Sequence, residues 1–208
     1  MRIAVFGANG RTGQVLCAEA LGRGHEITAY VRDKAKMAVA DPRFEVVEGT
    51  LDNVGAMARA LQGADAVVLA LGTTDRKPNT VLSDGTRAII DAMKTAGVEH
   101  LAAITSMGCG DSKSQVNSRI MRLVIKTFAK EIWADKNRQE AAIRASGLDY
   151  LIVRPGGLTE KPARGSWTEL RTGESYKGSQ MIPRADVATY ILNRLETPSL
   201  GDDTVTLF

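Results

Sequence analysis

The sequence predicts a single α/β domain built on a doubly wound parallel sheet. Short apolar runs alternate strictly with helical patterns along the 208 residues, and the runs lack the polar–apolar alternation of a strand with one solvated face. Strands buried on both faces of a parallel sheet read this way, and strict alternation with helices implies right-handed crossovers. With 44% hydrophobic and 25% charged residues, the composition is that of a globular protein with a full core.

The expected elements follow one another at short intervals. Strands are predicted at 2–6, 26–31, 44–48, 65–71, 100–105 and 149–154, with a last strand at 204–208 that closes one edge of the sheet. Helices are predicted at 11–23, 53–62, 80–96, 118–145 and 185–196. Residues 155–184 are rich in glycine and proline and interrupt the alternation. We expect one domain, 1–208, with 107–135 and 155–184 as its substrate-side segments.

A glycine-rich turn joins the first predicted strand to the first predicted helix. Gly7, Gly10 and Gly13 give the spacing G-x-x-G-x-x-G, which differs from the common G-x-G-x-x-G fingerprint. Glycine lets the backbone turn sharply beside a pyrophosphate, and the amides at the helix N-terminus then face the phosphates. The turn therefore predicts a dinucleotide cofactor in a Rossmann-like NAD(P)-binding fold. The turn also carries three polar side chains, which we expect either to contact the phosphates or to face only solvent: Asn9, Arg11 and Thr12.

The end of the second strand favours NADP (NADPH) over NAD. The fingerprint expects an acidic residue about 20 positions after the glycines, where it binds the ribose 2′-hydroxyl, but Arg32 stands 19 positions after Gly13. A guanidinium pairs well with the oxygens of a 2′-phosphate, and Lys36 adds a second cation. The alternative is that both cations are surface residues and that Asp33 binds the ribose.

The residues that follow the other strands are further candidates, because ligands of open α/β sheets bind past the carboxyl ends of the strands. Leu51 is expected to lie on the adenine, with Thr50 or Asp52 at the edge of the ring. A glycine after the fourth strand lets the backbone approach the cofactor. The other expected cofactor contacts are Leu71, Gly72, Thr73, Thr105 and Pro155.

Composition excludes several other classes of function. Subtracting 24 acidic from 27 basic residues leaves a net charge of +3, too small to indicate a nucleic-acid partner. Two cysteines and two histidines have no ligand spacing, so no metal is expected. No run reaches the roughly 18 apolar residues of a membrane span. The first strand begins at residue 2 and leaves no room for a signal peptide, so a cytoplasmic location is expected.

The chain also carries, in order, stretches that resemble the atypical branch of the short-chain dehydrogenase/reductase superfamily, most of all the biliverdin IXβ reductase and flavin reductase family. These stretches are 5–13, 31–33, 71–73, 80–85, 91–94, 105–106 and 146–150. The resemblance implies an NADPH-dependent reductase, usually monomeric, that acts on a flat conjugated substrate such as a flavin or a bilin. It also implies that Arg32 and Lys36 hold the 2′-phosphate, that Leu51 packs near the adenine, that Gly72 and Thr73 line the cofactor, and that Ser106 faces the nicotinamide.

The chain departs from that family at three places. Thr50 replaces an aspartate that is common after the third strand, which affects the adenine contact. Gly156 and Gly157 stand where the mammalian enzymes carry Pro-His, so a substrate-side histidine is missing. The segment between Ser106 and Ser146 is longer here, and its residues 119–133 are expected to reshape the substrate entrance.

The expected chemistry is hydride transfer without a tyrosine acid. Most short-chain dehydrogenases pair tyrosine and lysine as Tyr-x-x-x-Lys, but Ile132 stands four positions before Lys136. This argues against alcohol/ketone interconversion and sugar-nucleotide epimerisation, and fits a conjugated acceptor whose proton comes from solvent. Ser106 and Lys136 are the candidate catalytic residues; the alternatives are a serine that caps the strand end and a solvated lysine. An apolar platform for the substrate, or core packing, is expected at Met107, Trp133, Leu158 and Trp167.

Two other functions stay open. One is a non-catalytic NADP-binding redox sensor of the NmrA-like type, and the other is a reductase of quinones or small conjugated carbonyls. The segment 119–130 is basic and amphipathic, which is typical of a lid helix with a solvated basic face or of a surface that binds a partner or a membrane.

Overall fold

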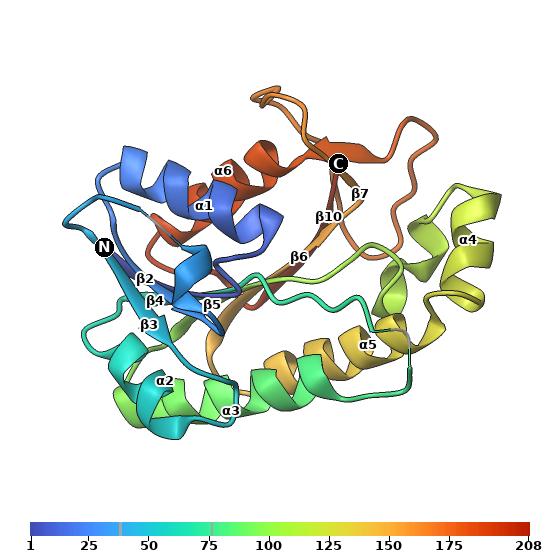
Figure 1. The fold of residues 1–208 in the computed structure, drawn as a ribbon. Helices are drawn as coiled ribbons and strands as arrows, with labels where there is room; N and C mark the ends of the chain where they lie inside the picture. The colour runs from blue at the N-terminus through green and yellow to red at the C-terminus, as the bar shows by residue number, and fades with distance from the viewer. Residues whose placement is uncertain (38, 76) are drawn as a thin grey trace.

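The core of the protein is a twisted sheet between two layers of helices (Figure 1). The computed structural model describes residues 1–37, 39–75 and 77–208. Across this described part, eight strands join in the order β3-β2-β1-β4-β5-β6-β10-β8. All neighbours pair in parallel except β10 and β8. Their bounds are β1 Arg2–Phe6, β2 Glu26–Val31, β3 Phe44–Glu48, β4 Ala66–Leu69, β5 His100–Ile104, β6 Asp149–Pro155, β8 Glu169–Leu170 and β10 Asp203–Leu207.

Helices cover both faces of the sheet. Helices α1 and α6 pack on one face, and α2, α3 and α5 pack on the other (Figure 1). Their bounds are α1 Arg11–Gly22, α2 Val54–Leu61, α3 Val81–Ala96, α4 Arg119–Lys126, α5 Lys130–Arg144 and α6 Arg184–Leu195, with 3-10 turns at η1 Lys34–Lys36 and η2 Gly110–Gln115. A second small parallel pair joins β7 Gly157–Thr159 to β9 Met181–Pro183. The doubly wound sheet that the sequence predicts is confirmed.

The central strands are mostly apolar because both of their faces are buried. In β1, Ile3 and Val5 belong to the core beneath α1 and α6, whereas Ala4 and Phe6 belong to the core beneath α2 and α3. All four side chains are fully buried. Residues alternate between the faces of a strand, so a strand between two helical layers needs apolar side chains at every position.

Three expectations about the elements were wrong. The predicted helix 118–145 is two helices, because Thr127 leaves helical geometry and its hydroxyl donates to the carbonyl of Leu123 at 2.8 Å. Such a bond gives the backbone an alternative to continuing the helix. The last strand, β10, does not close the sheet, since β8 pairs on its outer side and forms the edge. The irregular segment 155–184 contains three short strands, β7 to β9.

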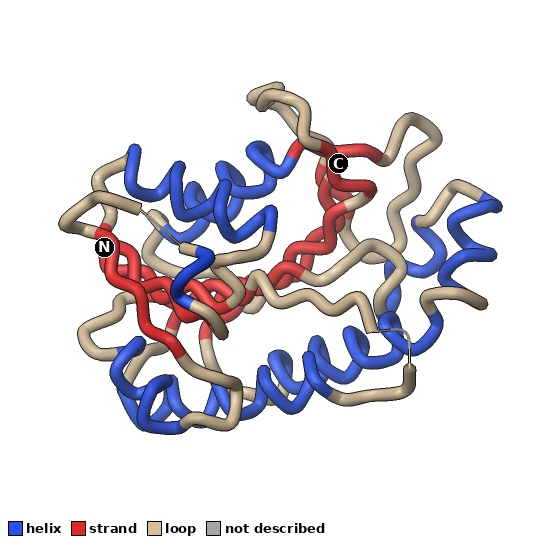
Figure 2. The backbone as a smooth tube through the Cα atoms, viewed as in Figure 1, coloured by secondary structure: helices blue, strands red, loops and turns tan. Residues whose placement is uncertain are grey.

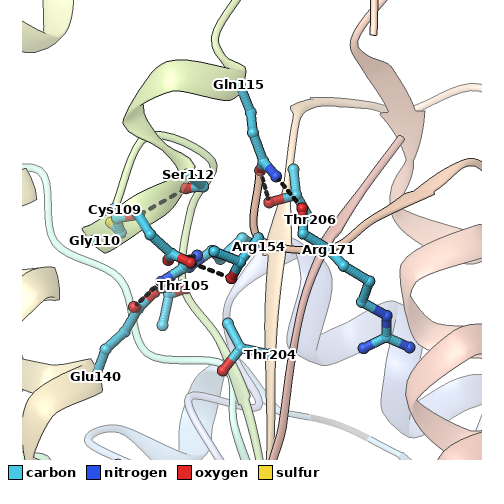
Figure 3. Close-up of polar contacts among 12 residues, drawn as sticks. Thr105, Cys109, Gly110, Ser112, Gln115, Glu140, Arg154, Arg171, Thr204 and Thr206 are labelled. Carbon is cyan, nitrogen blue, oxygen red and sulfur yellow. Dashed lines mark hydrogen bonds and ion pairs between the residues drawn. The ribbon is translucent and has the colours of Figure 1, made fainter. Parts of the chain in front are cut away.

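A buried ion pair joins α5 to the ends of two neighbouring strands (Figure 3). Glu140 on α5 is fully buried and accepts two hydrogen bonds from Arg154 of β6, at 2.9 and 2.7 Å. It also accepts the hydroxyl hydrogen of Thr105, just past β5, at 2.7 Å. Arg154 in turn donates to Asp111 of η2 at 2.5 Å. The four groups fix the ends of β5 and β6 to the helix and to the start of the segment 107–135.

Asp111 is the partly exposed member of this cluster. Partial burial alone raises the pKa of its carboxyl, but hydrogen bonds from Thr172 and Arg154 outweigh that effect and hold the pKa below its usual value. The carboxylate therefore stays charged beside Arg154, and it ties η2 to residue 172 of the other substrate-side segment.

We expect Glu140→Gln to lower the free energy of unfolding by about 3–5 kcal/mol, because Arg154 then stays buried without its buried carboxylate partner and keeps only the partly exposed Asp111. Urea unfolding followed by circular dichroism measures the loss. Arg144→Gln is the matched control: Arg144 contacts the same carboxylate at 3.2 Å but its side chain is 37% exposed, so we expect a loss below about 1 kcal/mol. Equal losses in the two variants would show that the buried pair has no special role.

Candidate functional site

The predicted site residues gather at the carboxyl edge of the sheet. The strand order reverses between β1 and β4, and ligands of open α/β sheets bind at such a reversal. The connections that leave the carboxyl ends of β1, β2, β4 and β5 all run along this edge (Figure 2). The sheet topology therefore brings the glycine turn, the cations after β2 and the polar residues after β5 to one side of the protein.

The glycine turn needs glycine for steric reasons at two positions. Gly7 has a φ of +87°, and a Cβ there would lie 2.6 Å from the carbonyl oxygen of Ala70, past the end of β4. A Cβ on Gly13 would overlap the carbonyl oxygen of Gly7. A side chain at Gly7 or Gly13 would push the turn away from β4, and the N-terminus of α1 would move away from β4 with the turn. The turn therefore brings the N-terminus of α1 close to the reversal point.

The N-terminus of α1 is open to an anion. Gly10 precedes the helix without a side-chain cap, and its first turn has no acidic residue. Each of the other α-helices in the described ranges has a side-chain cap or an acidic residue there. Uncapped amides and a positive helix end are what a pyrophosphate needs. The residues therefore fit a dinucleotide at this position.

The polar side chains of the turn have different surroundings. Asn9 donates to the carbonyl of Asp33 at 3.0 Å, which ties the turn to the end of β2. Its Oδ1 is buried without a protein donor, so it is left as an acceptor for a ligand hydroxyl. Arg11 is exposed and pairs with Glu160 at 3.2 Å, whereas Thr12 is half-buried at the start of α1.

Arg32 and Asp33 differ in how far they are engaged. Asp33 accepts the amide hydrogen of Ala35 at 3.0 Å and contacts the ammonium of Lys36 at 3.3 Å, so both of its carboxylate oxygens have partners. Arg32 is exposed and has no ion-pair partner within residues 1–37, 39–75 and 77–208. The geometry leaves a guanidinium, rather than a carboxylate, ready for a ligand at this strand end.

The expected adenine contacts lie past β3. Thr50 is exposed, and its hydroxyl donates to Asp52, which lowers the pKa of that carboxyl. Its carbonyl accepts from the Tyr30 hydroxyl at 2.7 Å. Leu51 is half-buried and packs against α3, where a Cβ on Gly85 would collide with it. A carboxylate is therefore present beside Thr50, although the aspartate of the family is missing.

The residues past β4 are accessible from the same edge. Leu71 is half-buried, and Gly72 is exposed with no atom within 4 Å of the place where its Cβ would lie. The Thr73 hydroxyl accepts from the amide of Asp75 at 3.0 Å, which shapes the connection that follows. The backbone of this stretch is open to close approach by a ligand.

Lys136 lies beside the end of β5 and is not a solvated lysine. It is 9% exposed and donates to the carbonyl of Thr105 at 3.2 Å. Burial lowers the pKa of its ammonium, partly opposed by Cys109 and Glu140 nearby. Ser106, the next residue after Thr105, is half-buried, and within the described residues its hydroxyl has no hydrogen-bond partner. Pro155 is buried, and its carbonyl accepts the amide hydrogen of Met107 at 3.0 Å.

The apolar platform that the sequence suggested is not one surface. Met107 and Trp133 pack together with Val116 and Ile125, and the Trp133 indole donates to the carbonyl of Met107 at 3.1 Å. Leu158 and Trp167 pack instead against the core beneath α6. Core packing therefore accounts for these four residues.

Sequence reasoning missed Glu140, Arg154 and Asp111 as parts of the site. Two signals pointed to them: Glu140 shares a helix face with Lys136 four positions earlier, and Arg154 ends an otherwise apolar strand. An arginine at the end of a buried strand needs a partner, but the partner is set by the packing of α5, which no local pattern reveals.

Other kinds of site are not found in the described part of the chain. No group of three or more His, Cys, Asp or Glu residues there could hold a metal ion. No helix there is both long and apolar enough to span a membrane. A hollow at the opposite, amino edge of the sheet is lined by Lys94, Asp149 and Asp202 among others, and contains none of the predicted site residues.

Comparison with known proteins agrees with this geometry. The chain is 26% identical to the oxidoreductase aflX of Aspergillus parasiticus over 98% of its own length and 85% of that protein. ChuY, an anaerobillin reductase from Escherichia coli O157:H7, superposes with a TM-score of 0.83 at 25% identity, covering 100% of this chain and 97% of that one. A short-chain dehydrogenase/reductase from Veillonella parvula in complex with NADP shares the fold with a TM-score of 0.84 at 18% identity, covering 99% and 93%.

Residues 7–198 match the family described as NAD(P)H-binding, a range that starts at the first glycine of the turn. It contains every predicted site residue. The chain therefore belongs to the NAD(P)H-binding family, and NAD(P)H is its cofactor.

Proposed function

We propose that the protein is an NADPH-dependent reductase that transfers hydride to a flat conjugated acceptor, either a flavin such as FMN or riboflavin, or a bilin such as biliverdin IXβ. The observation that carries this proposal is the junction of β5 with α5, where the buried Lys136 donates to the carbonyl of Thr105, next to Ser106, and Ile132 stands where a tyrosine acid would be. Bound NADPH would supply the hydride, and the residues of the chain bind, orient and shield it. The relatives named as an oxidoreductase and an anaerobillin reductase support this class of reaction.

No tyrosine hydroxyl takes the place of the missing acid. The Tyr30 hydroxyl donates to the carbonyl of Thr50, and the Tyr190 hydroxyl contacts Glu169. Tyr150 lies near the amino end of β6, and Tyr176 stacks against Phe208 at a centroid distance of 4.8 Å. Conjugated acceptors do not need a strong protein acid at the carbon that receives the hydride, so alignment suffices and solvent supplies the proton.

The two candidate catalytic residues have distinct roles in this proposal. The free hydroxyl of Ser106 donates to the nicotinamide amide or to the acceptor. Lys136, held at 3.2 Å from the carbonyl of Thr105, directs its remaining N–H groups toward the ribose next to the nicotinamide. Burial keeps this ammonium in one position, which orients the ring for transfer.

The acceptor is proposed to lie between the segments 107–135 and 155–184. Gln180 donates to the carbonyl of Gln115 at 2.7 Å, and its side-chain oxygen accepts the amide hydrogen of Asn117 at 3.0 Å. These hydrogen bonds join the two segments. Within 155–184, Gly156 and Gly157 replace the Pro-His of the mammalian enzymes, so the proposed acceptor site has no histidine there.

NADP is favoured over NAD because Arg32 is unpaired and Asp33 is engaged. We expect Arg32→Ala to raise the KM for NADPH by about tenfold or more, since a charge-assisted hydrogen bond contributes about 1.5–3 kcal/mol. The KM for NADH should stay unchanged, because NADH has no 2′-phosphate. Lys94→Ala, which removes an exposed cation on α3, is the charge-matched control. An equal rise in KM for NADPH and NADH would show that Arg32 supports the fold and does not bind the 2′-phosphate.

The acceptor class is tested by turnover. Purified protein, NADPH and either FMN or biliverdin are mixed, and oxidation is followed at the NADPH absorbance band. We expect enzyme-dependent oxidation with at least one of them and none with simple alcohols or ketones. Tight NADPH binding by calorimetry without turnover of any flavin or bilin would contradict the proposal and favour a redox sensor. If the protein oxidises NADPH only with quinones or small carbonyls, the acceptor belongs to one of those classes and is not a flavin or a bilin.

We expect Lys136→Met to separate activity from stability. Removing a buried charge should leave the free energy of unfolding at neutral pH unchanged or higher, while kcat falls about tenfold or more.

The pH dependence of stability gives a second readout. Folding lowers the pKa of Lys136, so the free energy of unfolding of the wild type rises as the pH increases from that folded-state pKa to the unfolded-state pKa of about 10.4. The variant lacks this rise. Thermal unfolding across pH and steady-state rates measure both effects, and Lys94→Met is the control. A large loss of stability would make Lys136 structural.

A further inference from the structure

Helix α4 and the turn after it expose several large apolar side chains to solvent. Ile120, Leu123 and Phe128 are 77%, 60% and 68% exposed, and Met121 is also exposed. Within the described residues ten large hydrophobic side chains are exposed, and four of them fall in this nine-residue stretch. Ile125 is the buried residue through which α4 packs on the protein. In Figure 1, α4 stands at the periphery, apart from the helical layers that cover the sheet.

Cations flank this apolar surface, and acidic residues are missing from it. Arg119, Arg122 and Lys126 recur at intervals of three and four and therefore share one face of α4. Lys113 and Lys130 lie on either side of the helix, and the sequence from 112 to 130 has no Asp or Glu. None of these five cations forms an ion pair with a residue in the described ranges. The charges are thus free to attract an anionic surface.

A second segment extends the same surface. The side chain of Asn117, just before α4, donates to the carbonyls of Tyr176 and Gly178 at 3.2 and 2.8 Å. Tyr176 and Met181 are 37% and 47% exposed, and Lys177 between them is exposed as well. Six of the ten exposed large hydrophobic side chains therefore lie in 120–128 and 176–181, which these hydrogen bonds join.

We propose that this surface docks the protein on an anionic phospholipid bilayer, with α4 lying in the interface. An amphipathic helix that combines large apolar side chains with lysine and arginine binds at the headgroup level. Each cation near the surface adds attraction to anionic lipids. A second copy of this chain is a poor occupant, because a twofold contact would bring two sets of unpaired cations together. The protein is peripheral to the membrane, in line with the lack of a spanning helix in the described residues.

Co-sedimentation of the full chain with vesicles tests the proposal. Phosphatidylcholine vesicles with and without about 30% phosphatidylglycerol are compared at low and high salt. We expect binding to the anionic vesicles that weakens with salt, and little binding to the neutral ones. Arg119→Gln combined with Lys126→Gln should weaken binding about 25-fold, at about fivefold per cation. Ile120→Ser combined with Phe128→Ser should weaken it about tenfold or more.

Matched controls remove similar groups elsewhere. Val54→Ser with Val81→Ser removes two exposed apolar side chains on α2 and α3, which are 69% and 56% exposed. Arg59→Gln with Lys94→Gln removes two exposed cations. Both controls should bind as the wild type does, and circular dichroism verifies that every variant folds.

Three results would overturn the proposal: no binding to anionic vesicles, equal binding to neutral vesicles, or binding that the α4 variants leave unchanged. If the protein does not bind vesicles but forms a concentration-dependent dimer, and the Ile120 and Phe128 substitutions abolish that dimer, the surface serves self-association instead. Because the variants lie outside the cofactor site, their affinity for NADPH in calorimetry should stay at the wild-type value whether or not vesicles bind.

Discussion

A single buried carboxylate organises the reactive end of this protein. Glu140 sits without solvent contact among Arg154, Thr105 and Arg144, and it receives hydrogen bonds from all three. Burying a lone carboxylate costs several kcal/mol, and the two hydrogen bonds from the Arg154 guanidinium offset that cost. The pair in turn fixes which way the last residues of β5 and β6 point. Ser106 and Pro155 are each one residue beyond a member of this network, so their positions follow from it.

The two halves of the cofactor site are therefore built by different physics. The dinucleotide half depends on backbone: Gly7 and Gly13 let the turn press against β4, and the uncapped N-terminus of α1 supplies dipole and amides. The half that we propose for the nicotinamide depends on buried side-chain charges, with Lys136 and Glu140 on one face of α5. Substitutions in the first half act through steric overlap, whereas those in the second act through desolvated charge. Because the dinucleotide half depends on the backbone of the turn and on the start of α1, a turn with unusual glycine spacing still suits a dinucleotide.

Local pattern predicted the strands and the glycine turn, and missed features that depend on tertiary contacts. The apolar runs located six strands to within two residues at each end, because burial on both faces favours apolar side chains. The steric need for glycine at Gly7 and Gly13 accompanies a local turn that the sequence pattern indicates, whereas the phosphate contact of Arg32 stays a prediction. The break at Thr127 could not be predicted, since the helical pattern continues through it and a side-chain hydrogen bond accompanies the end of the helix. The burial of Glu140 has no local signal, because its partner Arg154 comes from a strand that packs beside it only in the folded chain.

The segments 107–135 and 155–184 follow a third pattern, in which polar side chains join the two segments while apolar side chains pack within each or against the main core. Gln115, Asn117 and Gln180 bond each segment to the other, while Asp186, fully buried on α6, accepts the amide hydrogens of Arg164 and Gly165. Hydrogen bonds of this kind specify geometry but contribute little net stability. Loops held this way diverge without disturbing the sheet, because the scaffold does not depend on them. Acceptor preference can thus change while the cofactor edge stays fixed, and since the two segments are bonded to each other, such a change involves both.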